Sequence, residues 1–188
     1  MRGIKTYHTA DEFFKIARSL GRCELVDGEI QLMEPAGGEH GNLAIKIGSR
    51  LNVFVEEHNL GAVFAAETGY ILKHAQKEGE RDTVRGIDAS FIRKERIPPE
   101  GIPKKFIPFP PDLAVEVVSP GDTKREVAEK VQEYLDFGVP LVWVVSPTEK
   151  TVTVYRANGE VEVKRDGDLL SGEDVVPGFT LKVDGIFV

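Results

Sequence analysis

The chain contains a continuous apolar run, Leu141 to Val145, in which neither face of a strand would carry a polar side chain. A strand of this kind is typical of a sheet that is covered on both faces. The segment just before it, 123–137, has apolar residues at helical spacing and begins at a capping residue. A helix that leads into a fully buried strand predicts an α/β arrangement.

The preceding segments supply the rest of the predicted sheet. Apolar residues at helical spacing over about 39–58 predict a long helix. Three strand-like runs follow it, at 62–72, 84–92 and 113–118. The core order is therefore helix, strand, strand, strand, helix, strand, and this order predicts a mixed sheet flanked by helices.

Two shorter elements are predicted before this core. Thr9 and Glu12 form a capping-box pattern, so we expect a helix to begin just after Thr9. Asp27 and Gly28 stand between two short apolar runs, which is a strong signal for a tight hairpin turn. The chain is therefore expected to open with a helix and a hairpin.

The remaining segments lie between and after the core strands. The proline-rich segment 97–111 predicts an extended surface loop, because proline cannot donate a ladder hydrogen bond. The alternating runs 151–155 and 161–164 predict two more strands. The turn-rich tail, 169–188, is expected to add edge structure.

Composition limits the classes of protein that are compatible with this chain. A length of 188 residues suits a single domain over 1–188. No apolar run approaches the roughly 20 residues of a membrane helix, and the first residues do not resemble a signal peptide. A single cysteine excludes an internal disulfide framework, so we expect a cytoplasmic location. A net charge of -7 argues against nucleic-acid binding without ruling it out.

Acidic residues inside the predicted strands are the main candidates for chemistry. Asp88 lies within GIDASFI, and Asp112 and Glu116 lie within PDLAVEVVSP. Asp112 and Glu116 share a strand face but stand roughly 13 Å apart along the strand. Asp88, on a neighbouring strand, can lie beside Glu116. Lys130, on the helix that follows, can reach back over the strand.

Such carboxylates indicate a cation site. Burying an unpaired carboxylate is costly, so clustered acids need a cation, basic partners or a raised pKa. Oxygen ligands suit magnesium or manganese, which can polarise a phosphodiester and activate water. The sequence therefore predicts a metal site at Asp88 and Glu116, with Asp112 as an outer ligand. Lys130 would stabilise the charge that develops on the phosphate.

Each of these residues also has a structural interpretation. Asp112 follows a proline and can simply start a strand, while Asp88 and Glu116 can form buried ion pairs. Lys130 can be an ordinary surface lysine of its helix. His40, at the start of the long helix, can cap that helix, lie at the surface, or bind phosphate or metal.

Several strings, in their order and spacing, resemble the Uma-type family of restriction-endonuclease-like proteins over almost the whole chain. They are ELVDGEI, GGEHGNLAIKI, AAETGYIL, RGIDASFI, PPDLAVEVVSPGD, EKVQEYLDFGVPLVWVVSP, TVTVYR and DVVPGFTL. The resemblance implies the PD-(D/E)XK nuclease fold with a divalent-metal site. It places the acid of the second core strand at Asp88 and the acid of the third at Glu116.

The chain departs from this family signature at two positions. A lysine is expected two residues beyond the second acid, where this chain has Val118, and a proline just before the first acid, where it has Ile87. Lys130 is the best candidate to replace the missing lysine. The resemblance implies a magnesium-dependent endonuclease acting on DNA as a homodimer. The alternative is a catalytically degenerate nuclease fold that serves as a nucleic-acid-binding or regulatory module.

Overall fold

The structure, a computed structural model, describes residues 6–187. Its elements are, in chain order, α1 (Ala10–Leu20), β1 (Cys23–Val26), β2 (Glu29–Leu32), α2 (Gly38–His58), β3 (Gly61–Lys73), β4 (Thr83–Arg93), the 3-10 helix η1 (Lys94–Arg96), β5 (Leu113–Val117), α3 (Lys124–Asp136), β6 (Leu141–Ser146), β7 (Thr151–Arg156), β8 (Val161–Lys164), β9 (Leu169–Ser171) and β10 (Thr180–Lys182).

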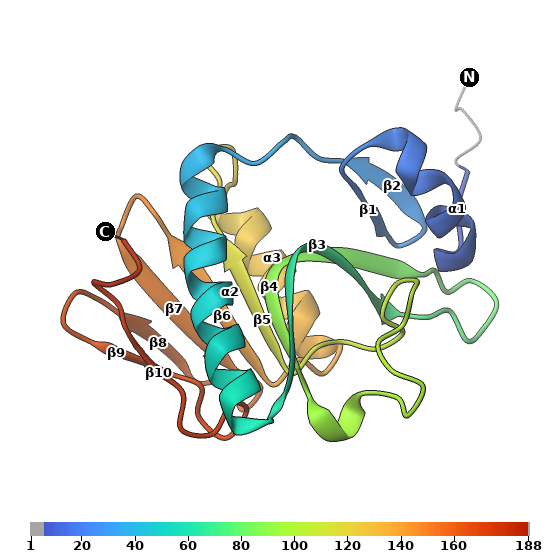
Figure 1. The fold of residues 1–188 in the computed structure, drawn as a ribbon. Coiled ribbons are helices and arrows are strands. Elements are labelled where there is room, and N and C mark those ends of the chain that lie inside the picture. The colour runs from blue at the N-terminus through green and yellow to red at the C-terminus, as the bar shows by residue number, and fades with distance from the viewer. Residues whose placement is uncertain (1–5, 188) are drawn as a thin grey trace.

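Eight of these strands form one mixed, mainly antiparallel sheet (Figure 1). The strand order is β2-β1-β4-β5-β6-β7-β8, and β3 also pairs with β4. β5 and β6 are parallel, because α3 carries the chain from the end of one strand back to the start of the other. The predicted α/β fold, with its mixed sheet flanked by helices, is confirmed.

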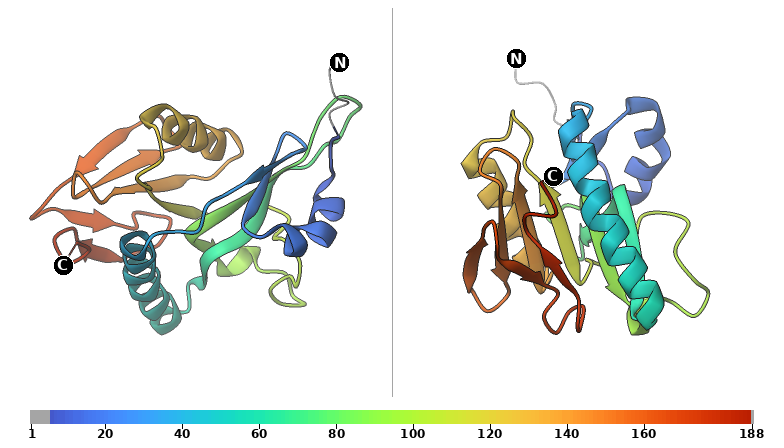
Figure 2. Two further views of the ribbon diagram at one scale, coloured as in Figure 1. Left: turned by 90° about the horizontal axis from the view of Figure 1, so that it is seen from above. Right: turned by 60° about the vertical axis from the view of Figure 1, so that its left-hand side comes forward.

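The long helix α2 and the shorter α3 cover opposite faces of the sheet (Figure 2). The fully buried strand β6 shows why both are needed. Trp143 belongs to the core on the α2 side, with Ile47 and Leu51. Val142 and Val144 belong to the core on the α3 side. The continuous apolar run in the sequence therefore reflects a strand with one helix on each face.

The ends of the chain extend this central unit in different ways. α1 and the hairpin of β1 and β2 lie at one end of the sheet, while β7 and β8 lie at the other (Figure 1). The tail does more than add edge structure. It forms a separate two-stranded sheet, and its Phe179 stacks on Trp143 with ring centroids 6.1 Å apart. The tail thus closes the core on the α2 side.

Most predicted element bounds agree with the structure to within one or two residues. The segment 97–111 is irregular, as expected, apart from a single bridge between Tyr70 and Ile107. Over residues 6–187, no helix combines the length and apolar character needed to cross a membrane.

Candidate active site

A cavity of about 590 Å³ lies between the β1–β2 hairpin, the end of β5 and α3. Its charged lining is dominated by acids. Seven carboxylate residues face two arginines and one lysine, and the acids are Glu24, Asp88, Glu116, Asp122, Glu126, Glu129 and Glu133. Repulsion among like charges at this density favours the binding of a cation.

Asp88 lies on β4 where this strand separates from β5. The last residue pair in register is Ala89 with Val115, one step before Asp88. Beyond it, the Asp88 carboxylate itself accepts the Val117 N–H at 2.9 Å. Its second oxygen lies 3.0 Å from His40 Nε2. Burial alone would raise the pKa of Asp88, but the contacts with His40 and the Val117 N–H outweigh burial and lower it. Asp88 is therefore held as an anion.

Glu116 occupies the face of β5 that α3 covers. Lys130 Nζ lies 2.9 Å from one carboxylate oxygen, and the Tyr134 hydroxyl donates to the other at 2.5 Å. Burial raises the pKa of Glu116 to about 7, and the charge of Asp88 adds to the effect, while Lys130 opposes it. Glu116 is thus a weaker acid than an exposed glutamate.

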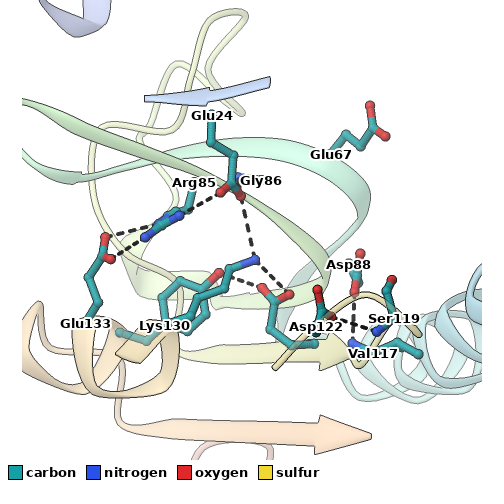
Figure 3. Close-up of polar contacts among 12 residues, drawn as sticks. Glu24, Glu67, Arg85, Gly86, Asp88, Val117, Ser119, Asp122, Lys130 and Glu133 are labelled. Carbon is teal, nitrogen blue, oxygen red and sulfur yellow. Dashed lines mark hydrogen bonds and ion pairs between the residues drawn. The ribbon is translucent and has the colours of Figure 1, made fainter. Parts of the chain in front are cut away.

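Lys130 reaches Glu116 from α3. A capping box between Thr123 and Glu126 begins this helix, and six residues separate the end of β5 from its first residue. The ammonium lies 3.6 Å from Glu24 Oε1 (Figure 3). It lies 2.9 Å from Glu116. Burial works to lower the pKa of Lys130, but the two carboxylates outweigh it and raise the pKa. The structure therefore brings Lys130 to Glu116.

Three further charged residues, which no sequence motif predicted, complete the network. Arg85 lies between Glu24, at 2.7 Å, and Glu133 (Figure 3). Glu24 also accepts the Gly86 N–H. Burial opposes ionisation of Glu24, yet Lys130 and Arg85 hold its pKa below the usual range. The only sequence signal was an acid inside the strand of ELVDGEI.

His40 is buried at the start of α2, with 7% of its surface exposed. The helix has Gly37 as its N-cap and no side-chain capping bond, so His40 does not cap it. Its Nδ1 lies 3.1 Å from the Ser119 hydroxyl, and its Nε2 lies against Asp88. The contact with Asp88 raises the pKa of His40, although burial opposes this. His40 thus links the end of β5 to Asp88.

Asp112 lies apart from this cavity, at the opposite end of β5 from Glu116. Its carboxylate lies 3.0 Å from Arg96 and accepts the Arg93 N–H at 2.9 Å. The structure therefore brings together Asp88, Glu116 and Lys130, and places Asp112 in an ion pair outside their cavity.

The donor set partly fits a divalent metal. Asp88 and Glu116 lie in one cavity and offer the oxygen ligands that magnesium and manganese prefer. Within the described residues, no group of three acids, histidines or cysteines is close enough to hold a metal. The protein would therefore supply two carboxylates, and water would complete the coordination, as is common for magnesium.

The fold is that of a restriction-endonuclease-like α/β protein. The structure resembles that of a protein from Anabaena variabilis described as "a putative nuclease belonging to DUF820". The TM-score is 0.81 at 24% identity, over 96% of this chain and 97% of the other.

The family follows from the sequence itself. Residues 10–184 match the model of the Uma2 family, described as "Putative restriction endonuclease", and the chain belongs to that family. A comparison with curated proteins found no match.

Proposed function

We propose that this protein is a divalent-metal-dependent endonuclease that hydrolyses phosphodiester bonds in DNA. The observation that carries the proposal is the position of Lys130. Its ammonium lies 2.9 Å from Glu116, in the cavity that also contains Asp88. Val118, at the place where the family signature has lysine, lines the same cavity. Lys130 thus supplies from α3 the charge that β5 does not carry.

In this proposal each side chain of the site has a separate role. Asp88 and Glu116 bind magnesium or manganese, which supplies a Lewis acid for the phosphate and a more acidic water. Lys130 stabilises the negative charge that develops on the phosphate oxygens. His40 holds the Asp88 carboxylate in place from the side of α2. Asp112 is left out of the metal site because its carboxylate is paired with Arg96.

The alternative is a nuclease fold that binds nucleic acid without cutting it. Two observations favour it. Val118 replaces the signature lysine, and the carboxylates that line the cavity outnumber its cations, which repels phosphate. A bound metal would reverse this repulsion, so metal dependence of DNA binding is expected under either function. Only the presence or absence of DNA cleavage distinguishes the endonuclease from the binding module.

We further propose that the protein acts as a homodimer in the cytoplasm. The dimer follows from the free edge of β8 at the end of the sheet. The location is inferred from the single cysteine of the chain.

The test is a cleavage assay on single-stranded and duplex DNA, with magnesium or manganese and with chelator. The wild type is expected to cut DNA only with metal, and Asp88→Ala to lose at least about a hundredfold in rate. Metal-dependent binding without cleavage would support the degenerate module. Cleavage that persists in chelator, or in Asp88→Ala at the wild-type rate, would contradict the proposed site.

A further inference from the structure

A second hollow, a groove of about 400 Å³, lies between α2 and β3. Its volume is within the range of small-molecule sites, about 300–1,000 Å³. Most of its walls are apolar. On α2, small residues at helical spacing leave the space open, and they are Gly41, Ala44 and Gly48. A side chain added at Gly41 would meet no atom within 4 Å, and one at Gly48 only the methyl group of Ala89, at 3.6 Å.

The opposite wall is a distorted stretch of β3. Ala65 and Ala66 are exposed along it. The register between β3 and β4 shifts between Ala65 and Thr68, and Glu67 has a left-handed backbone with φ of 68°. Next to this bulge, the methyl groups of Ala65 and Ala66 line the groove on the side opposite the small residues of α2.

One amide stands out in this apolar groove. Asn52 lines it from α2 and is half-buried. Within residues 6–187 its side chain has no hydrogen-bond or ion-pair partner. The two other polar residues of the helix wall already have partners, because Ser49 donates to the Lys46 carbonyl and His40 contacts Asp88 and Ser119. Its amide is therefore available to a ligand in the groove that carries its own donor and acceptor groups.

The groove is continuous with the catalytic cavity. Arg22, His40 and Asp88 line both of them. Arg22 is held at this junction by Glu67, at 3.0 Å, and by the Glu34 carbonyl. A guanidinium in this position suits a phosphate oxygen. A ligand that spans the junction would therefore place a phosphate near Asp88 and an apolar part in the groove.

We propose that this groove binds one nucleobase of a single-stranded DNA substrate, next to the phosphate that is cut. This inference rests on the proposed nuclease function and names its substrate class. A base has two flat, weakly polar faces for the apolar walls, and an edge of donors and acceptors for the amide of Asn52. A base inside the groove cannot remain stacked and paired in a duplex, so a single strand is favoured over a duplex.

The test uses a fluorescein-labelled strand of five deoxyadenosines, dA5, and five abasic strands, each of which lacks one base of dA5 but keeps every phosphate. Binding of each strand to the protein is measured by fluorescence anisotropy in the presence of calcium. For the wild type, one abasic position is expected to weaken binding by about tenfold, the scale of one stacked base. Ala65→Phe fills the groove from its exposed wall, and Asn52→Leu removes the amide. Both variants should bind intact and abasic strands alike.

Asn42→Leu is the matched control, because Asn42 is an exposed residue of the same helix and lines neither hollow. It should retain the wild-type difference between the strands. If the wild type binds dA5, and binds each of the five abasic strands as tightly as dA5, the groove proposal is wrong and the nuclease proposal stands. If dA5 and longer DNA do not bind at all with metal, both proposals fail.

Discussion

At the scale of single residues, Glu116 and Glu24 both contact the ammonium of Lys130, but their pKa values are shifted in opposite directions. The pKa of Glu24 is lowered, because Arg85 adds a second positive charge beside it. The pKa of Glu116 is raised to about 7, because burial and Asp88 outweigh Lys130. One lysine therefore does not neutralise both acids, and a metal beside Glu116 would remove the imbalance.

This imbalance predicts how Glu116→Gln changes stability. A carboxylate whose pKa is raised by folding stabilises the fold most at a pH below its pKa in the unfolded chain, about 4.5. This contribution is lost as the pH rises through the folded-state pKa of about 7. Gln resembles the protonated acid, so it should stabilise the metal-free protein by about 1–2 kcal/mol at pH 8, or roughly 3–6 °C. At pH 4.5 the two proteins should melt alike.

Thermal melting from pH 4.5 to 8 without metal checks this prediction. Glu129→Gln is the control, because Glu129 lines the same cavity but is exposed and paired with Arg125. A lower melting temperature for Glu116→Gln at pH 8 would mean that the ion pair with Lys130 dominates.

Residue types and spacing predicted part of the site. The sequence placed Asp88 beside Glu116 and Lys130 above them, because a strand face and a helix stripe are local patterns. Their catalytic and metal-binding roles stay predictions. The contacts of Arg85 with Glu24 and Glu133 could not be predicted in this way. They join residues 61 and 48 positions apart, and depend on how the hairpin packs beside α3.

At the scale of elements, the caps and turns of the sequence located most helices and strands. The predicted capping box begins α1, the predicted cap of α3 is a capping box as well, and the Asp27–Gly28 turn joins β1 to β2 as predicted. The tail was underestimated, because its short strands give weak periodicity while its apolar residues pack on the distant Trp143. The position of His40 was left open for the same reason, since its contact with Asp88 depends on how α2 packs against β4.

At the scale of the whole molecule, the free edge of β8 predicts a homodimer. Among residues 6–187, β8 pairs only with β7, and its Val161 and Val163 are 58% and 43% exposed. An unpaired strand with exposed apolar residues favours association with a second copy. Sedimentation of the wild type at micromolar concentration should give the dimer mass. Lysines at both valines should give a monomer, while Val53→Lys, on exposed α2 surface, should not. A wild type that stays monomeric would contradict the prediction.

The role of Lys130 is tested by the rate of DNA cleavage by Lys130→Met with magnesium or manganese. Methionine keeps most of the apolar stem and removes only the charge. We expect the rate to fall about a hundredfold, with the manganese-induced rise in melting temperature retained. Lys124→Met, an exposed lysine of the same helix, should cut at the wild-type rate. Cleavage by Lys130→Met at the wild-type rate would contradict the claim that Lys130 replaces the missing signature lysine.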